Sequence, residues 1–441
     1  MASSEAPGSG FLLNAGCAED CSLHSSGNVI PDPGWAPEDS LERLDRGSSS
    51  CKLRVMPNLL KVGLITLVIV ILGLVCVIGL AVGWVAWRQH KFASLEDSHN
   101  LGVQAGQMAQ TYLKDRPRGA LVIGIHQRGK DWVGGFGTTG GTPGAAPDGD
   151  SVFEIGSITK VFTGVVLARL VHDKVVALDD PISKHLPELA ADGREKITLR
   201  QLATHTSGLP RLTGDFWQIA TNRANPYAQY SAEQMYADVA TVKLRRPPGT
   251  AYEYSNYGAA LLGNLLANAS GETYGELLER IVMRPLAMSD TAPTITPAMQ
   301  ARLVPGHSIR GETTPGWDFA GFAPAGALRS TANDMLRFIR FSLSPDETDL
   351  GRAVTLSTEV HSRISGEEVG LGWHRRKTVE ELEFWWHNGG TGGYASFMAI
   401  DRKHQTGVIV IANSGDAMAG KFDVDRIGVD LMLKAARISL E

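Results

Sequence analysis

The chain has 441 residues, of which 43% are hydrophobic, and a formal net charge of -5. This length can bury a sizeable core, in one large domain or two ordinary ones. The mildly acidic balance lacks the basic surplus that contacts with phosphate backbones require, so nucleic acid is not an expected partner. All four cysteines lie within the first 76 residues, and we expect the remainder to fold without disulfides.

The N-terminal region shows two compositions in succession. Residues 1–61 are rich in Ser, Gly and Pro without a periodic apolar pattern, which predicts a disordered tail. Residues 62–87 form an uncharged apolar run that exceeds the roughly 20 residues needed to span a hydrocarbon core, with Trp84 and Trp87 at its downstream end. A buried core helix rarely stays apolar on every side for this length, so we predict one transmembrane helix, followed by a polar stalk over residues 88–100.

Basic residues indicate how this helix is oriented. Five of them precede the run, and only two follow it within a similar distance: Arg43, Arg46, Lys52, Arg54 and Lys61, against Arg88 and Lys91. The positive-inside rule then places the N-terminus in the cytoplasm and the globular part outside it, in the periplasm or at the cell surface. Gly79 and Gly83 form a small-xxx-small pair, a weak indication of a homodimer within the membrane.

The globular part, residues 101–441, alternates between strand and helix patterns. Periodicity predicts, in chain order, a helix over 101–114, strands over 119–127 and 131–138, a helix over 158–172, a largely helical section to about 331, a hairpin over 394–402 and 406–414, and a closing helix over 423–436. Strands at both ends with helices between them predict one α/β domain. Its antiparallel sheet is built from both termini, flanked by helices and interrupted by a helical insertion.

A lysine, Lys160, stands three residues after Ser157 at the start of the helix predicted over 158–172. Such residues share a helix face. Ser157 could serve only as a helix N-cap, but that leaves a cation in the first turn, where the helix dipole disfavours it. The dipole and the apolar face would both lower the pKa of the amine, which suits a base for a serine hydroxyl.

Two further motifs follow along the chain. In "YSN", Tyr254 near a lysine could act as a general base, and Asn256 could point to the same side of an extended segment and bind a substrate carbonyl. In "HNGG", the glycines after His387 would let a substrate lie against a strand edge. Taken singly, the first motif is also typical of a turn with packing tyrosines, and the second of a Gly-rich turn with an incidental histidine.

In this order and context, the S-x-x-K, Y-S-N and H-N-G motifs resemble the serine β-lactamase-like hydrolases, which include class C β-lactamases, D-alanyl-D-alanine carboxypeptidases and family VIII esterases. The resemblance covers roughly residues 101–441 and implies a β-lactamase/transpeptidase-like fold. The phrases "LATHTSGLP" (202–210) and "PAGALRSTANDM" (324–335) also look like this family, as scaffold and pocket wall.

The resemblance implies a role for each motif residue. Ser157 would be the acylated nucleophile, Lys160 would help to deprotonate it, and Tyr254 would be the general base or proton shuttle. Binding of the substrate would fall to Asn256, His387 and Gly389, and the N–H groups of Ser157 and Gly390 would form the oxyanion hole. The twelve histidines are scattered and H-E-x-x-H is absent, so neither a metal nor a cofactor is expected.

Two departures bear on the substrate. Y-S-N stands where class C β-lactamases usually have Y-A-N, and H-N-G stands where they have K-T-G. Because histidine is mostly neutral near pH 7, the usual anchor for a β-lactam carboxylate is weakened. We therefore expect a membrane-anchored serine hydrolase of the D-alanyl-D-alanine carboxypeptidase, penicillin-binding type, acting on a D-Ala-D-Ala peptide, a β-lactam or an ester. The alternatives are a carboxylesterase or β-lactamase of the same family, and a non-catalytic membrane scaffold or peptide-binding module.

Overall fold

The structure of the protein is a computed structural model that describes residues 100–140, 144–187, 193–213, 216, 222, 224–378 and 382–440. The predicted tail, transmembrane helix and stalk lie outside the described residues, except for Asn100. That residue belongs to the fold, because its side chain accepts a hydrogen bond from the Val103 N–H (3.0 Å) and its backbone pairs with Ser439. Within the described residues, no helix combines the length and the apolar character that crossing a membrane requires.

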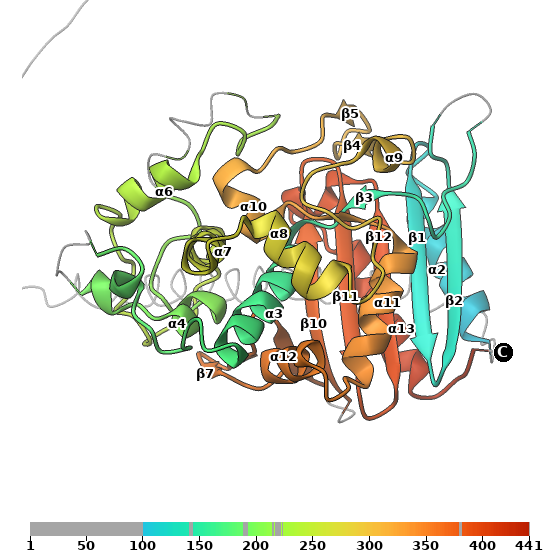
Figure 1. Cartoon of the computed structure of the whole chain (residues 1–441). Helices are drawn as coiled ribbons and strands as arrows, with labels where there is room; N and C mark the ends of the chain where they lie inside the picture. Colours follow the sequence, from blue (N-terminus) through green and yellow to red (C-terminus); the bar gives the residue numbers. More distant parts are fainter. Residues whose placement is uncertain are drawn as a thin grey trace, which may run out of the picture. The chain divides into compact units, whose positions relative to one another are not determined.

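An antiparallel sheet of eight strands forms the centre of the fold, in the order β2-β1-β12-β11-β10-β9-β8-β7 (Figure 1). Its strands are β1 (Ala120–Gln127), β2 (Lys130–Gly137), β7 (Ser362–Ile364), β8 (Glu367–Val369), β9 (His374–Lys377), β10 (Glu383–Gly390), β11 (Ala395–Asp401) and β12 (Thr406–Ala412). The N-terminal hairpin joins the C-terminal one through β1 and β12, where Val122 pairs with Ile411. The prediction of a sheet built from both termini is confirmed.

Side-chain alternation sends the residues of the central strands into two separate cores. Val122, Ile409 and Ile411 face a core that includes α3 (Thr159–His172) and α11 (Ala332–Leu343). Ile123 and Val410 face the other, with α2 (Leu101–Leu113) and α13 (Asp423–Ala435). Because both faces are covered, these strands read as continuous apolar runs instead of an alternating pattern.

The insertion between β2 and β7 holds most of the helices, of which α4, α6 and α7 lie to the left of the sheet in Figure 1. Besides α3 and α11, they are α4 (Leu199–Ala203), α6 (Ala232–Val239), α7 (Asn256–Ser270), α8 (Tyr274–Leu278), α9 (Pro297–Gln300), α10 (Ala323–Gly326) and α12 (Asp349–Ser357). Two small sheets pair β3 (Phe153–Glu154) with β6 (Arg329–Ser330) and β4 (Gly306–His307) with β5 (Thr313–Thr314).

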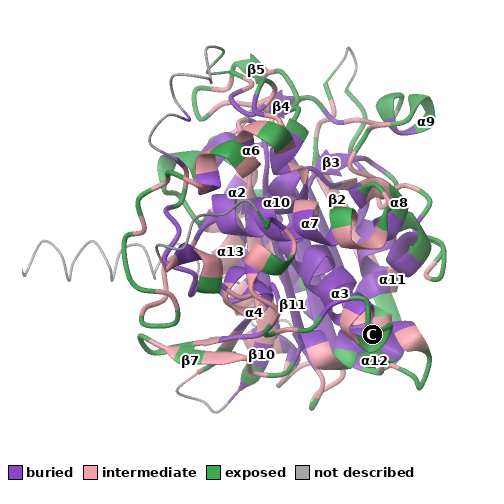
Figure 2. Cartoon of the chain, turned by 60° about the vertical axis from the view of Figure 1, so that its left-hand side comes forward, coloured by how far each residue is buried: buried purple, intermediate pink, exposed green. Residues whose placement is uncertain are grey.

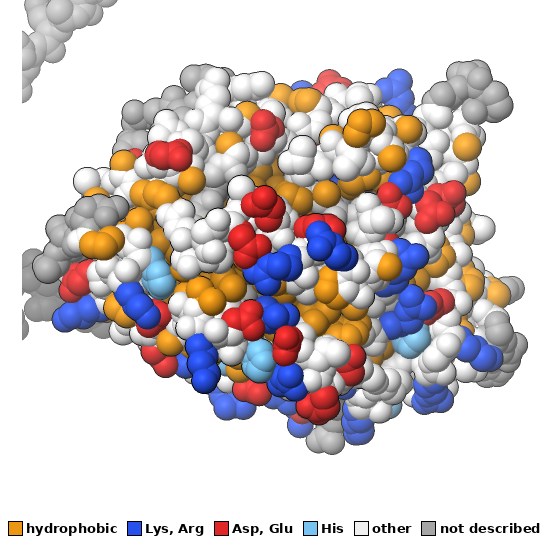
Figure 3. Space-filling model, viewed as in Figure 1, with side chains coloured by type: hydrophobic (Ala, Val, Ile, Leu, Met, Phe, Trp, Pro, Cys, Tyr) orange, Lys and Arg blue, Asp and Glu red, His pale blue; other side chains and the backbone are white. Residues whose placement is uncertain are grey.

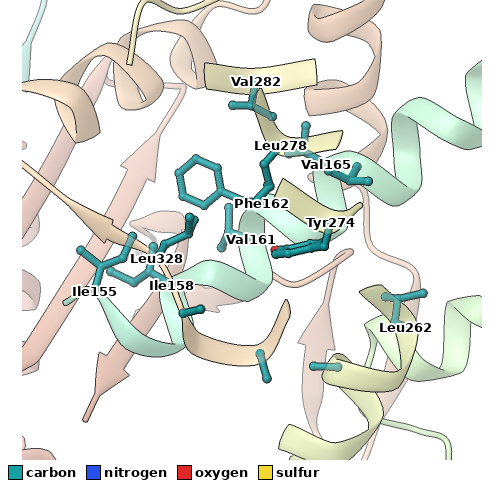
Figure 4. Close-up of a cluster of buried hydrophobic side chains, with 14 of the residues drawn as sticks. Ile155, Ile158, Val161, Phe162, Val165, Leu262, Tyr274, Leu278, Val282 and Leu328 are labelled. Carbon is teal, nitrogen blue, oxygen red and sulfur yellow. The ribbon is translucent and has the colours of Figure 1, made fainter. Parts of the chain in front are cut away.

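Helix α3 is buried on nearly every side, as are most residues of α7 and α10 (Figure 2). The apolar side chains of α3, including Val161, Phe162 and Val165, lie among Leu278, Val282 and Leu328 (Figure 4). Close packing of this kind leaves little freedom for the backbone. The start of α3 is therefore a rigid place from which to present side chains.

Prediction and structure agree on the elements with strong periodicity. The helices predicted over 101–114, 158–172 and 423–436 are α2, α3 and α13, each within two residues at either end. Strands β7 to β9 were not predicted, because "SRI", "EEV" and "HRRK" are short and largely polar. On the face seen in Figure 3, basic and acidic side chains are interspersed, in keeping with the small net charge.

Candidate active site

Ser157 lies in a 3₁₀ turn, Gly156–Ile158, that runs directly into α3. The residue at the N-cap of α3 is Ile158, and no side chain caps this end, so the alternative of Ser157 as an N-cap is wrong. Its hydroxyl oxygen instead accepts a hydrogen bond from Lys160 Nζ at 2.9 Å. Gly156 has a φ of +51°, a left-handed conformation that glycine adopts without strain, and this sharp turn projects Ser157 from the helix end.

Lys160 is 2% exposed, and its Nζ also donates to the Ala325 carbonyl at 2.6 Å. Burial, and then the positive charge of Arg211, hold the pKa of Lys160 well below its ordinary value. The pKa is lowered as predicted, and of the two predicted causes the apolar surroundings act, since burial is the leading one. A buried amine of this kind favours the neutral form, whose lone pair can accept a proton.

Tyr254 completes a cluster with these two residues. Tyr254 lines the same cavity as Ser157, and Lys160 Nζ lies 5.1 Å from the centroid of its ring. Burial raises the pKa of Tyr254 to about 12, so the phenol keeps its proton near pH 7. Of the two candidate bases, Lys160 is the one whose pKa moves toward neutrality.

Asn256 lies near this cluster, but it belongs to a helix and not to the extended segment that was predicted. It is the first residue of α7, which Ser255 caps by accepting from the Gly258 N–H at 2.8 Å. The prediction that Tyr254 and Asn256 share one side of an extended segment is wrong, because the extended backbone ends at Ser255. Both residues nevertheless line the same cavity as Ser157, since the helix begins at its wall.

The H-N-G motif lies at the end of β10, next to the turn that holds Ser157. A Cβ atom added at Gly156 would lie 2.7 Å from the Gly390 nitrogen, and one added at Gly389 would collide with the Ile155 carbonyl oxygen. Gly389 and Gly390 both line the cavity. The two segments, far apart in sequence, are thus brought into backbone contact at the nucleophile.

His387 is fully buried and does not line the cavity. Its Nδ1 donates to the Asn388 carbonyl at 2.6 Å, and its ring lies 5.2 Å from that of His374 and 6.2 Å from that of Tyr254. Burial, and then the neighbouring His374, lower the pKa of His387 well below its ordinary value. His387 is therefore a neutral ring beside Tyr254, whereas the predicted contact with a substrate would require it to line the cavity.

His205, within the phrase "LATHTSGLP", holds the segment that carries Tyr254. Its Nδ1 accepts from the Ser255 N–H at 3.2 Å, and its ring packs against Tyr254 with centroids 4.5 Å apart. Across the described part of the chain, no three His, Cys, Asp or Glu side chains are grouped as they would be to hold a metal ion. The histidines around Tyr254 instead form a wall of buried, uncharged rings.

The cavity has a volume of about 750 Å³, and the sequence did not reveal most of its wall. One side is aromatic, with Tyr227, Trp317, Phe319 and Phe322, and Arg211 adds a positive charge. In the sequence, the only indication of these wall residues was their position in or next to the two family-like phrases. Arg211 directly follows "LATHTSGLP", and Ala325, whose carbonyl holds Lys160, lies within "PAGAL".

Asn388, between His387 and Gly389, is held from outside the cavity. Its side-chain amide donates to the Asp425 carboxyl on α13 at 2.5 Å. Burial raises the pKa of Asp425 to about 7, although the hydrogen bond from Asn388 opposes this shift. The contact ties the end of β10 to a helix on the other side of the sheet, and thereby steadies the strand beside Ser157.

The close approach at Gly389 leads to a first prediction. Gly389→Ala should lower the free energy of unfolding by about 1 to 3 kcal/mol and slow acylation, because β10 must move away from the Ile155 carbonyl. Denaturant unfolding and the rate of acylation measure the two effects. Gly275→Ala on α8 is the control, since its added Cβ meets only Pro293 Cγ at 3.6 Å. Equal stability of the two variants would contradict a rigid contact at Gly389.

Comparison with known proteins agrees with this geometry. The model of the β-lactamase family, described as "Beta-lactamase", matches residues 106–429. The D-alanyl-D-alanine-carboxypeptidase/endopeptidase AmpH of Escherichia coli K12 is 32% identical over 283 residues, which cover 60% of this chain and 71% of AmpH. Protein flp of Staphylococcus aureus N315 is 27% identical over 279 residues, covering 59% of this chain and 52% of flp.

Solved structures share the fold. A β-lactamase/D-alanine carboxypeptidase from Pseudomonas syringae superposes with a TM-score of 0.66 at 19% identity, covering 76% of this chain and 98% of its own. A class C β-lactamase from Rhodobacter sphaeroides gives 0.65 at 18% identity, covering 75% and 99%. The predicted β-lactamase/transpeptidase-like fold is confirmed. With a family match over most of the chain, the protein belongs to the β-lactamase family and is a serine hydrolase.

Proposed function

We propose that the protein is a carboxypeptidase that cleaves a D-Ala-D-Ala type of peptide end through an acyl-enzyme on Ser157. The observation that carries this proposal is the 2.9 Å hydrogen bond between the buried Lys160 amine and the Ser157 hydroxyl, at the wall of a cavity of about 750 Å³. The similarity to AmpH, named as a D-alanyl-D-alanine-carboxypeptidase/endopeptidase, supports this substrate over the alternatives, which are esters and β-lactams.

In the proposed mechanism, the neutral Lys160 amine keeps one N–H on the Ala325 carbonyl and takes the Ser157 proton on its lone pair. The freed Ser157 oxygen attacks the carbonyl carbon of the scissile bond. The N–H groups of Ser157 and Gly390 stabilise the resulting oxyanion, each contributing roughly 3 kcal/mol by analogy with other oxyanion holes. Asn256, at the cavity wall, orients the substrate amide.

Collapse of the tetrahedral intermediate breaks the C–N bond, and the leaving amine takes up a proton. Tyr254 relays this proton from Lys160, since its ring lies beside Lys160 Nζ in the cavity of Ser157 and its raised pKa keeps it protonated. Water then attacks the acyl-enzyme with Lys160 again as base, which releases the acid and restores the Ser157 hydroxyl. Gly389 leaves room for the substrate along β10. His387 packs against the Tyr254 ring from within the protein.

The sequence supports a location for this activity. We propose that residues 62–87 anchor the protein in a membrane as a single span, with residues 1–61 in the cytoplasm and the catalytic domain outside. Resistance to extraction at alkaline pH, and protease sensitivity of the catalytic domain from the outer side only, would support this topology. Cross-linking of Gly79→Cys would test the weak homodimer. Full release by alkaline extraction would contradict the anchor.

The activity is tested on the full-length protein in detergent. Benzylpenicillin and a peptide ending in D-Ala-D-Ala are added separately, and intact mass and released D-alanine are followed. We expect D-alanine release and a long-lived penicilloyl adduct on Ser157. Rapid turnover of penicillin would indicate a β-lactamase, and cleavage of a nitrophenyl ester alone an esterase. No adduct and no turnover of any of the three compounds would contradict the proposal and favour a non-catalytic scaffold.

A further inference from the structure

The cavity beside Ser157 carries positive charge without a matching negative one. Two arginines, Arg211 and Arg245, line it, and none of the described residues that line it is acidic. Arg245 is committed elsewhere, since its guanidinium lies 3.0 Å from Glu253 Oε1. Arg211 is exposed and, within the described part of the chain, pairs with no carboxylate. An exposed, unpaired guanidinium in a cleft is available to a ligand.

Arg211 is also close to the reacting atoms. Its guanidinium carbon lies 5.1 Å from the centroid of the Tyr254 ring, and Tyr254 lines the same cavity as Ser157. Lys160 Nζ lies at the same distance from that ring. A group bound by Arg211 would therefore lie beside the Tyr254 ring, in the same cavity as the nucleophile. This spacing suits a charge on the same small molecule as the scissile bond.

The cation that the K-T-G motif would supply has no counterpart at the H-N-G position. His387 is fully buried, does not line the cavity and is held neutral. A carboxylate that entered the cavity would find no charged partner on β10, and Arg211 is the remaining uncommitted cation among the described lining residues. Guanidinium groups bind carboxylates with two parallel hydrogen bonds, which a lysine cannot reproduce.

We propose that Arg211 binds a free carboxylate of the substrate and restricts the enzyme to acyl compounds that carry one near the scissile bond. The rest of the cavity fits an apolar group on the same molecule. Tyr227 and Phe319 stack with ring centroids 5.2 Å apart, and Met418 and Phe422, 57% and 50% exposed, stand on the wall as well. The substrate class is thus an N-acylated amino acid or peptide with a free carboxylate and an apolar side chain.

This inference rests on the proposed acyl-enzyme mechanism, and the experiment separates the two. The full-length protein in detergent is given two thioesters, N-(phenylacetyl)glycyl thiolactate and the uncharged methylamide of the same compound, and thiol release is followed. The variants are Arg211→Gln, Arg211→Lys and, as the control, Arg245→Gln, which removes a paired charge from the same cavity. Each rate is taken on the pH plateau of its own variant, because the Arg211 charge also lowers the pKa of Lys160.

We expect the wild type to prefer the carboxylate compound by about 10- to 100-fold in kcat/KM, as typical for a hydrogen-bonded charge pair. Arg211→Gln should lose this preference, because kcat/KM for the carboxylate compound should fall by about 10- to 100-fold more than kcat/KM for the methylamide. Arg211→Lys should keep part of it, and Arg245→Gln should keep it in full. Equal hydrolysis of both compounds by the wild type would overturn the role of Arg211 and leave the acyl-enzyme mechanism intact. No hydrolysis of either compound would overturn both.

Discussion

Replacement of Ser157 by alanine will abolish formation of the acyl-enzyme and lower kcat/KM by roughly 10⁴-fold or more, the loss typical of a serine nucleophile. The fold should survive, because the Ser157 hydroxyl caps no helix and Lys160 retains its hydrogen bond to the Ala325 carbonyl. We expect the free energy of unfolding to change by less than about 1 kcal/mol. Intact mass after incubation with benzylpenicillin and thermal unfolding measure the two quantities.

The control for this variant is Ser151→Ala. Ser151 is buried, its hydroxyl donates to Asp148 at 2.8 Å, and it does not line the cavity. That substitution should leave the acyl adduct in place. If the Ser157→Ala variant formed the adduct in undiminished yield, another residue would be the nucleophile. That result would contradict the proposed mechanism.

Replacement of Lys160 by methionine should lower the acylation rate by roughly 10³-fold or more while the nucleophile remains in place, because the loss of a positioned base costs at least this much in related triads. Lys160→Arg should not restore the rate, since a guanidinium stays protonated at every accessible pH. Single-turnover acylation with benzylpenicillin measures both variants. If Lys160→Met acylates normally and Tyr254→Phe does not, Tyr254 is the base.

The dependence of kcat/KM on pH also tests Lys160 as the base. Lys160 acts as a base only when unprotonated, so kcat/KM should rise as pH increases through its lowered pKa. The charged neighbour that lowers this pKa is Arg211, and Arg211→Gln should therefore move the acid limb to higher pH, whereas Arg211→Lys should not. Burial keeps the surrounding histidines neutral, and it lowers the pKa of His374 to about 4. An acid limb that stays in place in Arg211→Gln would contradict this electrostatic coupling.

Much of the fold could be predicted because its signals are local. A few consecutive residues are enough to show the apolar runs of β1, β11 and β12 and the helical periodicity of α3. The strands β7 to β9 escaped prediction because they are short, polar and defined by their neighbours in the sheet. The pairing of Ser157 with Lys160 was also visible, since residues three apart meet on one turn.

By itself, the sequence determined the order of the elements, the three motifs and the candidate nucleophile, because spacing along a helix or strand dictates which neighbours share a face. Only the tertiary structure decided what these groups can do. The lowered pKa of Lys160 depends on burial beneath Ala325, 165 residues away, and on the charge of Arg211. The burial of His387 and the contact of Gly389 with the Ile155 carbonyl likewise arise between distant segments. Such effects come from desolvation and packing, which no local pattern of residues encodes.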